Sequence, residues 1–169
     1  MKRSKPESDL EARERVRKRA LRLLSGREHT VRELGEKLRA KGEADEDVVR
    51  TVVEELARKD LVSDERFARA FALDAVRMKP RARRRIVSQL VERGVPAAAA
   101  GHAVDAAFDE EEVDDRALAR RIAKAQLPRV ADASDETRWR RVATHLQRRG
   151  FDNTLIYDVC RDILPEPEA

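Results

Sequence analysis

Apolar residues recur along most of the chain with the spacing of a helix rather than that of a strand. In the first such stretch, Val16, Ala20, Leu23 and Leu24 fall at i, i+4, i+7 and i+8, which places them on one helical face. No segment shows the alternation of apolar and polar residues, rich in β-branched side chains, that is typical of a strand. The pattern therefore predicts an all-α protein.

Capping residues and glycines divide this pattern into short helices. The first helix is expected to run from Asp9 to Ser25 and to end at Gly26. Thr30 and Glu33 then form a capping box, in which the Thr30 hydroxyl accepts from a free backbone N–H and Glu33 reaches back to the N–H of Thr30. Further helix starts are expected at Asp45, Ser63, Pro80, Pro96, Ser134 and Asp152. The residues expected to face inward in the helix after Ser63 are Phe67, Ala70, Phe71 and Met78.

The order of short helix, capped helix, glycine and third helix occurs three times. The copies align on Gly42, Gly94 and Gly150, which are 52 and 56 residues apart. An apolar residue stands four and eight positions before each glycine, and ten and fourteen positions after it. Repeats that contact only their neighbours build an elongated body. The sequence therefore predicts an elongated, curved array of three tandem three-helix repeats, in which each of these glycines has a positive φ.

The repeat also sets the expected domain boundaries. Pro128 is expected to break the first helix of the third repeat, which leaves 128–134 as the loosest internal segment. We expect a basic N-terminal tail and helix start over residues 1–18, repeats over 19–62, 63–108 and 109–164, and a C-terminal tail over 165–169.

Charged residues dominate the composition. Of 169 residues, 37 are Lys or Arg and 33 are Asp or Glu, and the formal net charge is +4. No apolar run approaches the roughly 20 residues of a membrane helix. The basic segment 1–6 is not followed by the apolar stretch of a signal peptide. The single cysteine excludes an internal disulfide. We therefore expect a cytoplasmic protein without membrane contact.

No set of residues in the sequence is typical of a catalytic or metal site. His29, His102 and His145 are not spaced at i, i+3 or i+4, and no cysteine lies near them. The glycines do not form a phosphate-binding loop. Cys160 takes a repeat position that is valine in the other two repeats, so we expect a core thiol. The sequence predicts no catalytic activity, no metal and no cofactor.

Arginine is concentrated on the middle helices of the second and third repeats. Like charges at i and i+4 cost an isolated helix on the order of 0.3 kcal/mol per pair, which favours an acidic partner; a solvated helix face is the alternative. Trp139 is the only tryptophan, so base stacking is only weakly indicated. Equivalent helices of stacked repeats lie side by side, which would join the arginines into one basic stripe. The candidate partner- or DNA-binding residues are Arg81, Arg83, Arg84, Arg85, Arg138, Arg140, Arg141 and Arg148.

Several motifs, in their order and spacing, resemble those of RecX-family regulatory proteins. The resemblance covers roughly residues 18–164. The sequence departs from the family at Ala82-Arg83, where the family has Gly-Pro before the middle helix of the second repeat. The segments that carry the resemblance are ALRLL at 20–24, REHT at 27–30, KLRAKG at 37–42, LVSDERFA at 61–68 and RGV at 93–95, together with Ile86 and Leu90.

This resemblance implies a protein without catalytic residues that binds RecA, the recombinase that coats single-stranded DNA as a helical filament. Proteins of the family lodge in the filament groove and inhibit ATP hydrolysis and strand exchange, in DNA repair and recombination. The expected partners are RecA and the RecA–single-stranded DNA filament, with direct DNA contact as a further expectation, and we expect a monomer. A sequence-independent DNA-binding helical module is the alternative, because the same arginines can contact phosphates.

Overall fold

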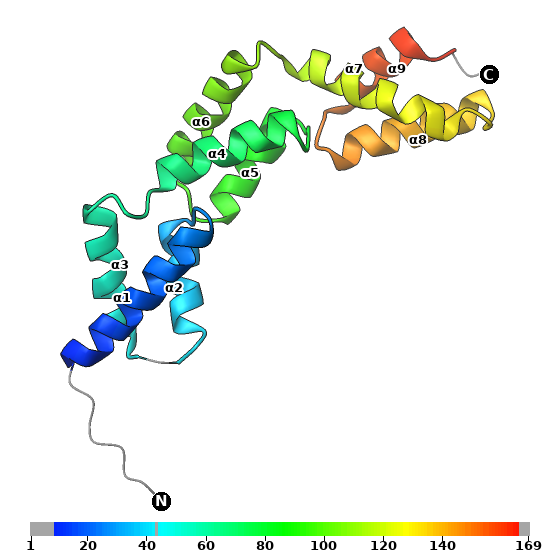
Figure 1. The fold of residues 1–169 in the computed structure, drawn as a ribbon. Coiled ribbons are helices and arrows are strands. Elements are labelled where there is room, and N and C mark those ends of the chain that lie inside the picture. The colour runs from blue at the N-terminus through cyan, green and yellow to red at the C-terminus, as the bar shows by residue number, and fades with distance from the viewer. Residues whose placement is uncertain (1–8, 43, 166–169) are drawn as a thin grey trace, which may run out of the picture.

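The computed structural model describes residues 9–42 and 44–165, and every regular element in this part of the chain is a helix. The helices follow one another in three groups along a bent, elongated body, with α1 at one end and α9 at the other (Figure 1). The predicted all-α array of three tandem three-helix repeats is confirmed. Of the predicted tails, residues 1–8 and 166–169 lie outside the described residues, as does Glu43, whereas residues 9–18 belong to the first helix.

We call the three groups of helices unit 1, unit 2 and unit 3. Within each unit, the helices pack on one another. Unit 1 consists of α1 (Asp9–Gly26), α2 (Val31–Arg39) and α3 (Glu46–Arg58). Unit 2 consists of α4 (Asp64–Arg77), α5 (Arg83–Glu92) and α6 (Ala97–Glu110). Unit 3 consists of α7 (Asp115–Gln126), the short 3-10 helix η1 (Leu127–Val130), α8 (Asp135–Arg148) and α9 (Asn153–Ile163).

Two separate apolar cores hold the described part of the body together. The core of unit 1 is built from buried residues of its three helices and includes Leu38 and Val52. The second core runs through units 2 and 3 and includes Phe108 and Phe151. Cys160 lies fully buried in this second core, as predicted. Units 2 and 3 thus share one apolar interior, whereas unit 1 has an interior of its own.

Two of the inward-facing positions predicted in α4 are wrong. Ala70 is exposed, and the Met78 side chain is 74% exposed. The buried face of α4 instead contains Phe67 and three alanines, and α6 packs against the helix there. Met78 follows the last residue of α4, where the chain leaves the helix, so it does not continue the buried face.

The middle helix of unit 2 starts later than predicted. Pro80 does not open it, because α5 begins at Arg83 and the preceding Ala82 is extended, with φ −59° and ψ 145°. The N–H of Ala82 donates to the carbonyl O of Arg149 in unit 3 at 3.0 Å. An extended residue cannot belong to a helix. The hydrogen bond from Ala82 to unit 3 therefore accompanies the later start of α5.

Side chains cap most of the predicted helix starts. Thr30, Ser63, Ser134 and Asp152 each accept a hydrogen bond from the backbone N–H three residues further on. Asp45 occupies the capping position of α3, but its side chain makes no capping hydrogen bond. The segment predicted to be loosest after α7 is helical at its start, because it begins within η1.

A glycine with positive φ follows the middle helix of each unit, as predicted. The φ angle is 60° at Gly42, 95° at Gly94 and 90° at Gly150. At the second and third glycines, an added Cβ would lie 2.8 Å from the Cβ of Arg32 and 2.7 Å from the Cβ of Arg85, respectively. A Cβ at the first glycine would meet no atom within 4 Å. Two of these glycines therefore let the backbone of one unit approach the middle helix of the preceding unit.

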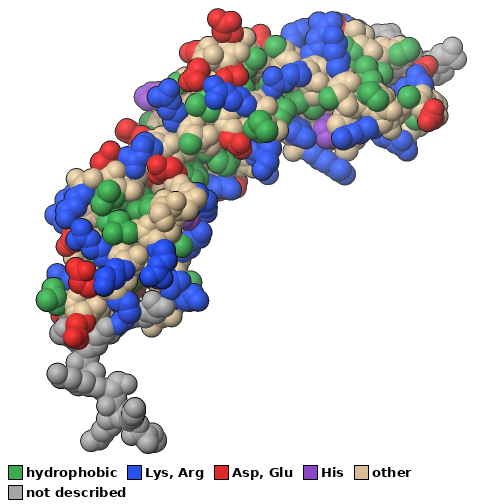
Figure 2. Space-filling view, in the orientation of Figure 1, with side chains coloured by type: hydrophobic (Ala, Val, Ile, Leu, Met, Phe, Trp, Pro, Cys, Tyr) green, Lys and Arg blue, Asp and Glu red, His purple; other side chains and the backbone are tan. Residues whose placement is uncertain are grey.

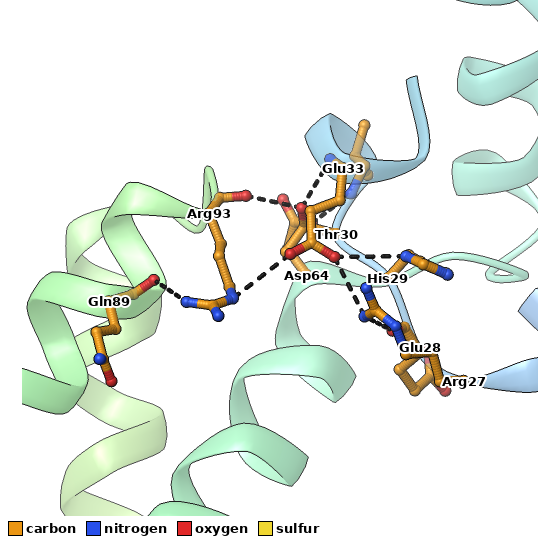
Figure 3. A network of polar contacts seen from close by, with 9 residues as sticks. Arg27, Glu28, His29, Thr30, Glu33, Asp64, Gln89 and Arg93 are labelled. Atoms are coloured by element: carbon orange, nitrogen blue, oxygen red, sulfur yellow. Dashed lines mark hydrogen bonds and ion pairs between the residues drawn. The ribbon is translucent and has the colours of Figure 1, made fainter. Parts of the chain in front are cut away.

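Unit 1 meets unit 2 through polar contacts around the start of α2 (Figure 3). The Thr30 hydroxyl donates to the carbonyl O of Arg93 at 2.7 Å and accepts from the N–H of Glu33 at 3.0 Å. The N–H of Val31 donates to Asp64 Oδ1 at 2.8 Å. Atoms of unit 2 thus help to satisfy the free backbone groups at the helix start in unit 1.

The Glu33 carboxylate departs from its predicted role in the capping box. Its Oε2 atom lies 3.2 Å from Arg27 Nη1 and 3.4 Å from His29 Nδ1, and its Oε1 atom lies 3.4 Å from Arg93 Nε (Figure 3). Burial lowers the pKa of His29, so this imidazole is neutral near pH 7. The carboxylate is therefore drawn to guanidinium groups, one from each unit, rather than back to the backbone of Thr30.

The same arrangement joins unit 2 to unit 3. Ala82 and Arg83 stand where unit 1 has its threonine and valine. The N–H of Ala82 donates to the carbonyl O of Arg149, and the N–H of Arg83 donates to Asp115 Oδ1 at 2.9 Å. Both junctions thus use the carbonyl before the positive-φ glycine and the aspartate that opens the next unit. They differ in that only the second junction lies within a shared apolar core.

The three glycines predict a graded series of stability losses. Gly42→Ala places a Cβ on a left-handed backbone without a clash and should lower the free energy of unfolding by about 1 kcal/mol. Gly94→Ala and Gly150→Ala also force a Cβ against the preceding unit and should cost about 2 kcal/mol or more. Urea denaturation followed by circular dichroism measures all three losses. Equal losses would contradict the close approach between units.

The two capping hydroxyls at Thr30 and Ser134 predict a second contrast. Ser134→Ala removes only a local cap and should cost about 1 kcal/mol. Thr30→Ala also leaves the half-buried carbonyl of Arg93 without its inter-unit donor, so it should cost about 2 kcal/mol. Hydrogen exchange should show the extra loss in the amides of unit 1. An equal effect of both variants would show that the hydrogen bond from Thr30 to the carbonyl of Arg93 contributes nothing to stability.

Candidate functional site

Positively charged side chains line a hollow between units 2 and 3. Its volume is about 530 Å³, and its walls come from the loop before α5, from α5 itself, and from α7, η1 and α8. Among the described residues that line it, none is acidic. The cations in the lining are Lys79, Arg81, Arg85, Arg129, Arg148 and Arg149.

A second hollow of about 350 Å³ continues the first along α8 and adds Arg140 and Arg141. Its described lining also lacks an acidic residue. We call the two hollows together the basic groove. On the face shown in Figure 2, Lys and Arg side chains gather along the lower edge of the arm that contains α7 and α8. The residues common to both hollows are Gln126, Arg129, His145 and Arg148.

The helical periodicity of α8 places its groove-lining residues on one face of the helix. Arg141, His145 and Arg148 are spaced at i, i+4 and i+7 and line the groove. Val142 and Leu146 each follow a groove residue directly and lie on a neighbouring side of the helix, where they are fully buried in the shared core. The same helix therefore anchors the unit through its apolar residues and presents cations to the groove.

Two groove arginines are held in place by neighbouring atoms. The Arg81 guanidinium donates to the side chain of Gln89 and to the carbonyl O of Lys79. Arg149 Nη1 donates to the carbonyl O of Pro80 at 2.6 Å, across the junction of units 2 and 3. Burial, reinforced by the charge of Arg149, lowers the pKa of Arg81. These side chains are thus fixed close together in spite of their mutual repulsion.

Three other groove arginines are available to a ligand. Arg85, Arg129 and Arg148 come from α5, η1 and α8, and none of their guanidinium groups has a hydrogen bond or ion pair with the part of the chain that the structure describes. Like charges that converge without counterions raise the free energy of the unliganded protein. An anion in the groove would relieve this repulsion and could accept hydrogen bonds from several guanidinium groups at once.

His145 lies between these cations. Its Nε2 atom is 3.2 Å from Nε2 of Gln126. Burial lowers the pKa of His145, and the charges of Arg149, Arg129 and Arg148 lower it further. The imidazole is therefore neutral near pH 7 and contributes no charge to the unliganded groove.

The structure brings five of the eight predicted site residues to the groove and gives another of them a role inside the protein. Arg83 forms an ion pair with Asp105, and its guanidinium carbon lies 4.2 Å from the ring centroid of Phe108. Contact of Arg83 with a partner stays a prediction. The predicted residues that line the groove are Arg81, Arg85, Arg140, Arg141 and Arg148.

The two remaining predicted residues also bind backbone atoms. Arg84 donates to the carbonyl O of Phe151 at 2.9 Å and to that of Gly150, so it ties α5 to unit 3. Arg138 donates to the carbonyl O of Val130 at 3.2 Å, which fixes the end of η1 against α8. Their contact with a partner stays a prediction, but charge reversal at either position would break an internal contact.

Four titratable groove residues are absent from the predicted set: Lys79, Arg129, His145 and Arg149. Arg149 directly follows Arg148 in the sequence, so the arginine cluster of this segment could have pointed to it. Lys79 and Arg129 lie outside the regular periodicity, in the loop before α5 and in η1, so no pattern pointed to them. His145 could have been found, because it stands four residues after Arg141 and three before Arg148 on the same face of α8.

Three further features of the described residues bear on a metal site, a reactive thiol and a membrane-spanning helix. Within residues 9–42 and 44–165, no group of His, Cys, Asp and Glu side chains could hold a metal ion. Burial raises the pKa of the Cys160 thiol to about 11, so the reactive thiolate is not populated near neutral pH. None of the described helices combines the length and apolar character needed to cross a bilayer.

Comparison with protein families gives three matches in succession. The model of the first RecX three-helix domain matches residues 17–56, that of the second matches 63–104, and that of the third matches 114–160. The regulatory protein RecX of Corynebacterium efficiens is 34% identical over 163 residues, which cover 94% of this chain and 77% of the relative. The regulatory protein RecX of Halorhodospira halophila is 39% identical over 140 residues, 83% of each chain.

Solved structures support the fold. The crystal structure of RecX from Lactobacillus salivarius matches with a TM-score of 0.72 at 18% identity and covers 91% of this chain and 97% of that one. A second RecX crystal structure matches with a TM-score of 0.76 at 19% identity and covers 96% of this chain and 82% of that one. From the family matches, the identity to curated relatives and the shared fold, the chain belongs to the RecX family of regulatory proteins.

Proposed function

We propose that this protein binds RecA and its filament on single-stranded DNA, lodges in the filament groove, and inhibits ATP hydrolysis and strand exchange. The observation that carries the proposal is the basic groove, in which unpaired guanidinium groups from two units converge without an acidic neighbour among the described lining residues. Membership of a family of regulatory proteins gives the regulatory role.

The shape of the body supports a long partner. The three units follow one another along a bent rod rather than closing into a ball (Figure 1). The basic groove spans two of these units, which share one apolar core, so the spacing of its cations is fixed by a common interior. A filament presents a repeating, extended surface, and DNA within it adds phosphate charge that complements the groove.

The proposed action needs no catalytic group in this chain. A regulator of this kind works by occupying a surface and by binding one state of its partner better than another. The buried thiol and the lack of a metal-binding cluster among residues 9–42 and 44–165 fit such a role. We also propose that the protein acts in the cytoplasm as a monomer.

Direct, sequence-independent DNA binding is the second candidate function. The observation that favours it is the same groove, because guanidinium groups pair with phosphates as readily as with carboxylates. Titration with bare single-stranded DNA and with RecA-coated DNA, at one near-physiological salt concentration, separates the two functions. Much tighter binding to the coated DNA supports the RecA regulator, whereas equal affinities support the DNA-binding module.

Charge reversal in the groove should abolish most of the inhibition. In the double variant Arg85→Glu, Arg148→Glu, each glutamate keeps the first two side-chain carbons of the arginine, so the fold should persist while the groove loses its attraction for anions. We expect half-inhibition of RecA-driven strand exchange to need about tenfold more protein, the effect of about 1.4 kcal/mol. Circular dichroism checks that the helices remain.

A matched control places the same change in net charge elsewhere. Arg58 and Lys59 are exposed at the end of α3 in unit 1. The variant Arg58→Glu, Lys59→Glu should inhibit like the unaltered protein. If the folded groove variant inhibits normally, the contact surface lies outside the groove, most directly in unit 1.

A further inference from the structure

His145 has a position in the basic groove that the proposed function does not use. It lines both hollows, at the point where they meet. Among the described lining residues, it is the side chain whose ordinary pKa lies near neutral pH. A change in its charge would therefore be felt along the whole groove.

The groups that face His145 are cationic or neutral on every element packed around it. On the α7 side it meets the Gln126 amide, and the remaining lining elements contribute cations. The described linings of both hollows contain no carboxylate that could stabilise an imidazolium. The cations are Lys79 and Arg81 from the loop before α5, Arg85 from α5, Arg129 from η1, and Arg140, Arg141, Arg148 and Arg149 from α8 and its end.

An anion in the groove reverses this balance. Burial continues to disfavour the charged ring, but the charge of the anion offsets that of Arg149, Arg129 and Arg148, so the part of the pKa lowering that comes from these arginines is removed. The protonated ring then has two N–H donors, and it can donate both to the anion and to the side-chain oxygen of Gln126 if the amide turns over. Ligand binding and proton uptake thus favour each other.

We propose that the basic groove is a phosphate-binding site whose occupation is coupled to protonation of His145. The inference deepens the proposed function. It rests on that function only because both take the basic groove as the contact surface. Phosphate is favoured over carboxylate because Arg85, Arg129 and Arg148 approach from three different elements. A tetrahedral group can accept from several directions, whereas a planar carboxylate accepts largely in one plane.

The dimensions of the groove point to a chain of phosphates. The two hollows have volumes of about 530 and 350 Å³ and are continuous through their shared lining, so they hold more than one phosphate group. A phosphodiester backbone passing from Arg85 to Arg140 would meet cations along the whole path. The ligand class is therefore the backbone of a single-stranded polynucleotide.

The test measures binding of a fluorescent thymidine oligonucleotide by anisotropy at about pH 5.5 and about pH 7.5, with ionic strength held constant. Thymine and phosphodiesters do not titrate in this range, so a pH effect reports on the protein. The pKa of His145 is lowered in the free protein and raised by the ligand, so binding should tighten as pH falls between these two values. Uptake of one proton gives up to about tenfold tighter binding per pH unit.

Two histidine variants make the assignment specific. His145→Gln should bind with a much flatter pH dependence, because the glutamine amide does not titrate in this range. His102→Gln is the matched control, because His102 is exposed on α6 outside the groove, and it should keep the full dependence. A variant at 145 that keeps the original slope would overturn the coupling.

A second measurement does not depend on the variant folding. Nuclear magnetic resonance of the unaltered protein follows the His145 imidazole during a pH titration with and without the oligonucleotide. The pKa should rise when the oligonucleotide is bound. An unchanged pKa in the saturated complex would contradict the proposal even if binding itself is strong.

Competition identifies the ligand. Inorganic phosphate should displace the oligonucleotide only at much higher concentration, and an oligoglutamate of equal charge should compete poorly. Displacement by free phosphate at matched concentration would reduce the site to a single-anion site, and tighter binding of oligoglutamate would assign it to an acidic protein segment. Inhibition of strand exchange, measured at neutral pH, tests the proposed function separately from the phosphate site. Inhibition can persist when the phosphate site is disproved, and inhibition can be lost when the phosphate site is confirmed.

Discussion

The close approach of each unit to the middle helix of the unit before it is the constraint on which the rest of the structure depends. Gly94 and Gly150 make it possible, because an added Cβ would collide with the preceding helix and because both have a positive φ. At this distance, the carbonyl before each glycine accepts a hydrogen bond from the start of that helix. Local backbone freedom at two residues thus sets the spacing of whole units.

The basic groove is a product of the second of these junctions. Arg149 immediately precedes Gly150, and the stem of Arg85 lies where a Cβ on that glycine would go. The contact that joins units 2 and 3 therefore also brings arginines of both units to one hollow. Arg84 ties the same junction from the other side by binding two backbone carbonyls. The contact that packs unit 2 against unit 3 therefore also forms the charged surface.

The helices and the repeat could be predicted from the sequence because they depend on local signals. The spacing of apolar residues, the capping of α2 by Thr30, and the three positive-φ glycines follow from neighbours in the chain. The roles of individual arginines could not be predicted from the sequence, because Arg83 and Arg85 have similar sequence surroundings. Their difference arises only when the first meets Asp105 and the second meets the next unit. The late start of α5 has the same origin in a contact between units.

The division into two cores gives the rod unequal stiffness along its length. Units 2 and 3 are joined by buried apolar contacts, which added salt does not screen. Unit 1 is joined to unit 2 largely by hydrogen bonds and ion pairs, such as the ion pair between Glu33 and Arg93, and salt weakens ion pairs more than it weakens apolar contacts. We therefore expect bending to be concentrated at one joint, between units 1 and 2. Such bending would let the first unit follow a curved surface while the charged groove keeps its shape.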